Sequence, residues 1–139
     1  MKKLQGEWKL VAWERRSSDG DVNYPFGQNP EGLLVYTPTK QMIVQMIAAG
    51  RKHVESSDPT GGSETERATA YSGNLSYFGT YEVDGDDVIH TIIGSAYPNW
   101  SDTVQRRAFE IDGDTLVLKT QPNSDDPKQV INAMIWRRN

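Results

Sequence analysis

The sequence predicts an all-β protein, a single antiparallel up-and-down β-barrel of about eight strands with one short helix. Three observations lead to this fold class. Apolar and polar residues alternate with period two through most of the chain, as in strands that bury one face. Short turn-forming clusters separate these segments, and only one segment has helical spacing. The 139 residues fit one domain, expected over 1–139.

The first strands are expected at residues 6–14, 32–37 and 41–48. If the alternation holds through the first of them, Trp8 lies on one face and Trp13 on the opposite face. Pro38 ends the second strand, because proline cannot donate a ladder hydrogen bond. In the third strand Met42, Val44 and Met46 alternate with Ile43, Gln45 and Ile47, which indicates one buried face.

The single helix is expected at about 63–74, after a polar loop at 50–63. Ser63 and Glu66 match a capping box, in which each side chain accepts a hydrogen bond from the other residue's backbone N–H. Ala68, Tyr71 and Leu75 follow at helical spacing.

The later strands are expected at 76–83, 88–94, 103–111, 115–120 and 129–138. Asp84-Gly85-Asp86 and Asp112-Gly113-Asp114 are hairpin turns, since glycine tolerates the positive φ that such turns need. The loop at 95–101 is expected to join neighbouring antiparallel strands. Closure into a barrel protects the edges of such a meander.

Composition excludes several classes of function. The net charge is −4, and lysines and arginines are spread along the chain, so no nucleic-acid partner is expected. The chain has no cysteine, hence no disulfide and no thiolate metal site. The N-terminus does not resemble a signal peptide, and no apolar run is long enough for a membrane helix. We therefore expect a cytoplasmic protein without a membrane partner, either a monomer or a homodimer.

The residues also carry a family resemblance. Gly6-Glu7-Trp8 is the Gly-x-Trp of the lipocalins, and the chain resembles the small lipocalin-like domain family of bacteria and fungi. The matching pieces are residues 8–14, 24–27, 34–38, 79–85, 88–90, 98–100 and 112–116, with Gln105, Arg107, Phe109, Trp136 and Arg138. Together they span nearly the whole chain.

The resemblance implies an up-and-down barrel with an interior cavity, but no single activity. Lipocalin-like barrels include plain carriers and also isomerases or cyclases of secondary metabolism. In lipocalins the tryptophan of Gly-x-Trp packs at the closed end under an arginine near the last strand. Here that implies Trp8 under Arg138 or Arg137.

His90 and Arg107 are the candidate catalytic residues. His90 is in phase with Val88 and Ile92, so it is either a general acid or base in a pocket or a hydrogen-bonded core histidine. Arg107 shares a strand face with Gln105, Phe109 and Ile111. It either binds a carboxylate, enolate or carbonyl of a ligand, pairs with an internal acid, or points outward.

These two side chains are expected to lie side by side on neighbouring strands. Arg107 would then lower the pKa of His90, leaving a neutral base beside a cation that stabilises an anion. The other ligand-binding candidates are aromatic, methionine or amide side chains that could equally be plain core: Tyr36, Met46, Tyr77, Tyr81, Trp100, Gln105, Phe109 and Met134.

We expect no cofactor and no metal, since two isolated histidines without cysteine are a poor ligand set. The predicted function is binding of a small, largely apolar or aromatic molecule in the barrel cavity. The alternative is a cofactor-independent isomerase or cyclase acting on a polyketide-like or terpenoid-like secondary metabolite. A third class, a structural domain, would have a filled core.

Overall fold

The computed structural model describes residues 4–122 and 125–139, which form nine strands and one α-helix. The strands are β1 (Gly6–Arg16), β2 (Val22–Asn23), β3 (Glu31–Tyr36), β4 (Gln41–Ile47), β5 (Asn74–Asp84), β6 (Asp87–Ser95), β7 (Thr103–Asp112), β8 (Thr115–Lys119) and β9 (Ile131–Arg138). The helices are α1 (Glu64–Ser72) and a short 3-10 turn, η1 (Pro98–Trp100).

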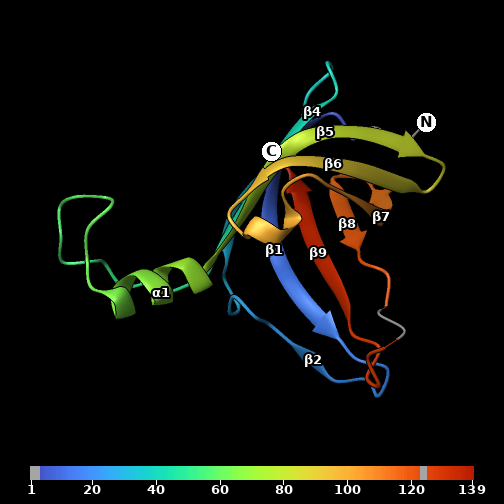
Figure 1. Cartoon of the computed structure of the whole chain (residues 1–139). Coiled ribbons are helices and arrows are strands. Elements are labelled where there is room, and N and C mark those ends of the chain that lie inside the picture. The colour runs from blue at the N-terminus through green and yellow to red at the C-terminus, as the bar shows by residue number, and fades with distance from the viewer. Residues whose placement is uncertain (1–3, 123–124) are drawn as a thin grey trace.

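The strands form one closed antiparallel barrel (Figure 1). From β3 to β9 each strand pairs with the next one along the chain, and β1 closes the barrel by pairing with both β3 and β9. β2 pairs with the end of β1, around Arg15 and Arg16. The predicted eight-stranded barrel is therefore confirmed, and β2 is an extra strand that the alternation did not indicate.

Side chains from alternate strand positions fill the barrel, as the period-two pattern predicted. Met42, Val44 and Met46 of β4 are buried, whereas Ile43 and Gln45 are exposed. The largest fully buried side chains are Trp8, Trp136, Tyr36, Phe109, Leu34, Ile92, Leu116, His90 and Val88. Leu34, His90 and Trp136 of this set also line the cavity described in the next subsection, whereas the other six do not.

The predicted faces of the first strand are wrong beyond Val11. Leu10 pairs with Trp136 and Ala12 with the next residue of β9, Ile135, so Val11 is an unpaired bulge residue, 42% exposed, and the alternation restarts after it. Trp13 therefore lies inside the barrel with Trp8, at 8% exposure. Its ring packs edge-on against Phe26, with 4.7 Å between the ring centres.

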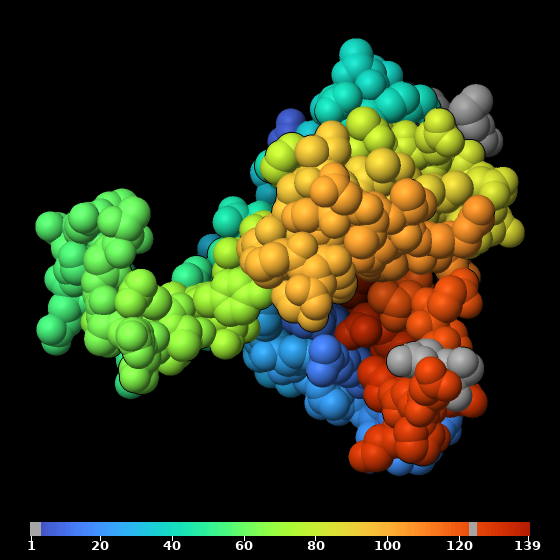
Figure 2. Space-filling model, viewed as in Figure 1, coloured from blue at the N-terminus to red at the C-terminus, as the bar shows by residue number. Residues whose placement is uncertain are grey.

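The predicted helix is confirmed with shorter bounds. Ser63 caps α1, and the capping box with Glu66 is complete. Residues 73–74 are outside the helix, and Leu75 belongs to β5 rather than to an apolar helix face. None of the residues of α1 is buried, and α1 and the preceding loop extend away from the barrel (Figures 1 and 2).

Smaller differences concern ends of elements. η1 occupies the middle of the predicted loop at 95–101. β9 begins at Ile131, two residues later than predicted, and residues 123–124, between the last two predicted strands, lie outside the described residues. In the described part of the chain, no helix is both long and apolar enough to cross a membrane.

Candidate functional site

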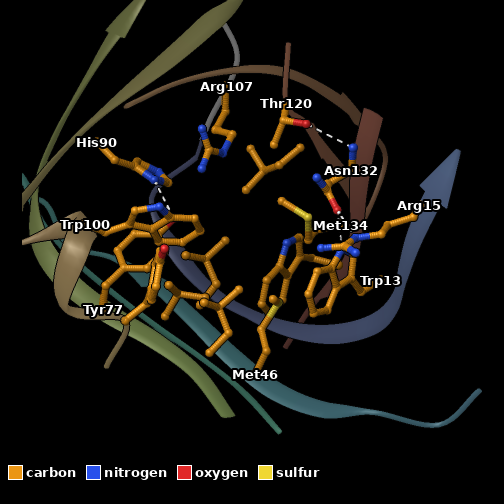
Figure 3. Close-up of a pocket in the computed structure, with 16 residues that line it drawn as sticks. Trp13, Arg15, Met46, Tyr77, His90, Trp100, Arg107, Thr120, Asn132 and Met134 are labelled. Atoms are coloured by element: carbon orange, nitrogen blue, oxygen red, sulfur yellow. Dashed lines mark hydrogen bonds between the residues drawn. The ribbon is translucent and has the colours of Figure 1, made fainter. Parts of the chain in front are cut away.

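The barrel holds a cavity of about 300 Å³ between β1, β3–β9 and η1 (Figure 3). Apolar side chains make most of its wall: Trp13, Leu34, Val44, Met46, Leu75, Trp100, Leu118, Met134 and Trp136. The polar side chains of the wall are Arg15, Tyr77, His90, Tyr97, Arg107, Thr120 and Asn132. Arg15 and Tyr97 are also exposed, so they mark the open end, where Figure 2 shows a hollow between the orange and blue segments.

His90 lies on the cavity wall with both ring nitrogens hydrogen-bonded. Its Nε2 is 2.6 Å from the Tyr36 hydroxyl, and its Nδ1 is 3.0 Å from the Tyr77 hydroxyl. The ring is 1% exposed. Burial, helped by the nearby Arg107 cation, lowers the pKa of His90 from 6.5 to about 3. The ring is therefore neutral at pH 7, and it is a weak base.

The tyrosines around His90 have different positions. Tyr77 lines the cavity, whereas Tyr36 lies behind His90 and packs against Tyr81, with 4.6 Å between ring centres. The Tyr81 hydroxyl donates a hydrogen bond to the Thr37 carbonyl oxygen, 2.8 Å away. Burial raises the pKa of Tyr77 and of Tyr36, so both hydroxyls stay protonated at neutral pH. Tyr36 and Tyr81 support the wall without forming it.

Arg107 is a buried cation, 8% exposed, on the same wall. Its Nη1 donates to the Arg106 carbonyl oxygen at 3.2 Å, and its Nη2 donates to the Gln105 side-chain oxygen. Among the residues that the structure describes, none is a hydrogen-bond partner of its Nε–H, and no carboxylate forms an ion pair with it. The internal acid that was one alternative for Arg107 is thus not among the residues described.

β6 and β7 are antiparallel neighbours, as predicted, but the register differs from the expected side-by-side arrangement. His90 is directly opposite Gln105, and Arg107 is opposite Val88. His90 and Arg107 are therefore diagonal neighbours on one face, and Figure 3 shows both side chains at the same end of the cavity. Whether both contact a ligand remains a prediction.

The other predicted ligand-binding residues divide into two groups. Met46, Tyr77, Trp100 and Met134 line the cavity. Gln105 lies beside Arg107 but not on the wall, and Phe109 is in the core. Trp100 reaches the cavity because η1 folds its ring against Tyr77 and Tyr97, at 5.8 Å and 5.7 Å between ring centres.

Sequence reasoning missed a polar cluster on β1 and β9. The Asn132 side-chain oxygen accepts hydrogen bonds from Trp13 Nε1 at 2.9 Å and Arg15 Nε at 3.2 Å, and Thr120 Oγ1 accepts from the Asn132 backbone N–H. Arg15 also lies over the Trp13 ring. The bulge in β1 hid Trp13 and Arg15 from the alternation, whereas an asparagine within the predicted last strand was a usable signal.

The charge on the wall is positive. Arg15 and Arg107 contribute to it, and none of the lining residues is acidic. The described residues hold no group of three or more histidines, cysteines or acids that could bind a metal. The cavity thus combines aromatic and aliphatic surface with cationic and neutral hydrogen-bonding groups.

Comparisons with known proteins agree with this architecture. Residues 5–139 match the family model described as a lipocalin-like domain. The curated 4'-hydroxy-3'-methoxypropiophenone carrier protein ppsC of Aspergillus oryzae is 33% identical over 87 residues, which are 57% of this chain and 78% of that protein.

Two solved structures resemble the fold over almost the whole chain. A lipocalin-like protein from Bacteroides uniformis has a TM-score of 0.52 at 12% identity, with 98% of each chain covered. An uncharacterized protein from Bacteroides eggerthii has a TM-score of 0.50 at 13% identity, with 99% of this chain and 100% of that chain covered. At these identities the similarity concerns the fold.

Proposed function

Because the chain belongs to the family of lipocalin-like domains, we propose that it binds a small, largely apolar or aromatic molecule inside its barrel and acts as a carrier. The observation that carries this proposal is the cavity of about 300 Å³ with its mostly apolar wall. Ligand sites are typically apolar clefts of roughly 300–1,000 Å³ with a few placed polar groups. A cavity at the lower end of that range fits a molecule with one or two rings.

The side chains of the wall favour a flat, aromatic ligand. Trp13, Trp100 and Tyr77 offer ring faces and edges, and Met46 and Met134 adapt to irregular shapes. The A. oryzae relative is named as a carrier of an aryl ketone, 4'-hydroxy-3'-methoxypropiophenone. A ligand of that kind, one aromatic ring with oxygen substituents, matches the chemistry of this wall.

Calorimetric titration with the neutral two-ring compound 2-ethylnaphthalene tests the proposal. We expect saturable 1:1 binding that Leu75→Trp weakens at least tenfold, because the larger side chain fills space at the half-buried wall. Val104→Trp, at a position 67% exposed on the outer face, is the matched control and should keep the wild-type affinity. Equal affinity in both variants would contradict a ligand-binding cavity, as would absence of saturable binding both by this compound and by its acceptor analogues naphthalene-2-carboxylate and 2-acetylnaphthalene. Native mass spectrometry of protein from its own host would identify a retained ligand.

A second candidate function is a cofactor-independent isomerase or cyclase acting on a polyketide-like or terpenoid-like metabolite. The hydrogen-bonded His90–Tyr77 pair near Arg107 favours it, because Tyr77 could deliver a proton while Arg107 stabilises an enolate. The carrier is preferred, since His90 is a weak base with both nitrogens engaged and none of the lining residues is a carboxylate.

Deuterium exchange separates the two functions. The methyl protons of 2-acetylnaphthalene exchange with D2O through its enol, and NMR follows the rate. A carrier leaves this rate at the buffer value. An enzyme accelerates it, and Tyr77→Phe and Arg107→Met then each reduce the acceleration at least tenfold while His53→Gln, in the exposed loop, does not.

A further inference from the structure

On the cavity wall, hydrogen-bond acceptors and donors differ, because the acceptor oxygens already accept hydrogen bonds whereas some donors have no acceptor. Asn132 Oδ1 accepts from Trp13 and Arg15, and Thr120 Oγ1 accepts from the Asn132 backbone. The Tyr97 hydroxyl accepts from Asn99 Nδ2 at 3.1 Å. Within the described ranges, the buried groups of the wall left without a partner are donors: the Nε–H of Arg107 and the Nε1–H of Trp136.

A third donor follows from the environment of Tyr36. Its hydroxyl is fully buried, and its one hydrogen-bond contact within the described chain is His90 Nε2. If Nε2 carried the proton, the Tyr36 hydrogen would be buried without an acceptor, which costs about 1–3 kcal/mol. Tyr36 therefore donates to Nε2, and the single proton of the neutral His90 ring lies on Nδ1.

This tautomer decides the role of Tyr77. The Nδ1–H of His90 donates to the Tyr77 oxygen, 3.0 Å away, so the hydroxyl hydrogen of Tyr77 is free for a group in the cavity. Tyr36 and His90 thus act as positioning residues: His90 orients the Tyr77 hydroxyl, and Tyr36 fixes the tautomer of His90. Figure 3 shows Tyr77, His90 and Arg107 around the same end of the cavity.

We infer that the part of this cavity where Arg107 and Tyr77 lie recognises an acceptor oxygen without a hydrogen of its own, as in a carboxylate, enolate or ketone, through these two residues. The inference rests on the proposed ligand-binding function and specifies the class of ligand. A ligand with a hydroxyl or ammonium donor at that end leaves Arg107 and Tyr77 facing another donor. A purely apolar ligand leaves both buried donors without partners.

The tautomer can be tested without any ligand. In uniformly 15N-labelled protein at pH 7, a long-range 1H–15N correlation spectrum distinguishes protonated from unprotonated ring nitrogens. We expect a protonated Nδ1 and an unprotonated Nε2 for the His90 ring, assigned by its loss in His90→Gln. A protonated Nε2 would overturn the donor role of Tyr77.

The ligand class can be tested with four compounds of one scaffold: naphthalene-2-carboxylate, 2-acetylnaphthalene, 2-ethylnaphthalene and 2-naphthylmethylammonium. We expect the carboxylate and the ketone to bind at least tenfold more tightly than the ethyl compound, and the ammonium compound to bind most weakly. The difference in affinity between the carboxylate and the ketone then measures the contribution of the cationic charge on the wall. Equal affinity of the ethyl compound and both acceptors overturns the inference, and absence of binding by all four overturns the proposed function itself.

Matched variants assign the preference to residues. Arg107→Met should remove most of the carboxylate preference and keep the affinity for 2-ethylnaphthalene. Arg106→Met changes the same charge on the neighbouring, exposed residue, which pairs with Asp84 and Asp87, and should keep the preference. Equal loss in both variants would mean that only the overall charge attracts the anion, which overturns a specific site.

The positioning role of His90 has its own pair of variants. Glutamine can accept from Tyr36 and donate to Tyr77, whereas leucine can do neither. We expect His90→Leu to reduce the ketone preference as much as Tyr77→Phe does, and the double variant to show no further loss. His90→Gln should restore at least half of the preference. Equal preference in His90→Leu and wild type overturns the role of His90, while that of Arg107 is judged by its own variants.

Discussion

The guanidinium carbon of Arg138 lies 4.0 Å from the centre of the Trp8 indole ring. The same guanidinium donates through Nη1 to the Gln5 carbonyl oxygen at 3.0 Å, and Trp8 Nε1 donates to the Leu4 carbonyl oxygen at 2.8 Å. Trp8 and Arg138 face each other across the β1–β9 pair, so they join the strands that close the barrel. Of the two partners that the resemblance implied for Trp8, Arg138 is confirmed.

Trp8→Ala should lower the free energy of unfolding by about 3–5 kcal/mol, the usual cost of deleting a buried large aromatic side chain. Trp8 is fully buried in the core of the barrel and does not line the cavity. Urea denaturation measures the effect, with Val11→Ala on the exposed bulge as the control, expected to cost less than about 1 kcal/mol. Similar values for the two variants would mean that Trp8 is not a core residue.

Arg138→Met should cost about 1–2 kcal/mol, because it removes a cation–π contact and a hydrogen bond at a partly buried position. Arg137 is the next residue along β9 and is exposed. Arg137→Met should therefore change the unfolding free energy by less than about 0.5 kcal/mol. The same denaturation experiment compares the two, and equal costs would contradict a specific Trp8–Arg138 contact.

Stability should fall as the pH falls below 6.5. The pKa of His90 is about 3 in the folded protein and near 6.5 in the unfolded chain, so only the unfolded chain takes up this proton between those values. The contribution of neutral His90 to the free energy of unfolding is complete above pH 6.5, and about 2–3 kcal/mol of this free energy should be lost by pH 4.5. Urea titrations of wild type and His90→Gln at several pH values measure this. Parallel stability curves for the two proteins would contradict the low pKa.

Arg107→Met should raise the free energy of unfolding of the ligand-free protein by about 1–2 kcal/mol, while it weakens binding of acceptor ligands. A buried cation without a carboxylate costs desolvation free energy, and an apolar side chain of similar length removes that cost. Arg106→Met is the control and should be near neutral or slightly destabilising. A large loss of stability in Arg107→Met would assign Arg107 to the fold instead of to a ligand.

The fold was predictable because burial of one strand face is repeated at every second residue, as in Met42, Val44 and Met46. The cavity was only partly predictable. The in-phase positions of His90 and Arg107 identified two of its polar residues, but the bulge at Val11 changes the phase of Trp13 without a marker in the sequence. The contact between Tyr36 and His90 joins residues 54 positions apart and depends on barrel closure. Local patterns therefore could not separate the tyrosine that faces the cavity from the two behind it.

The bulge in β1 separates the number of residues in the strand from the faces that they occupy. Before Val11, β1 contributes Trp8 to the core; after it, the same strand contributes Trp13 and Arg15 to the cavity wall. Because Leu10 pairs with Trp136 and Ala12 with the next residue, Ile135, deletion of Val11 would leave a regular strand with Trp13 still inside the barrel. The presence of the bulge, more than the number of residues before Trp13, therefore controls which side chains a ligand meets.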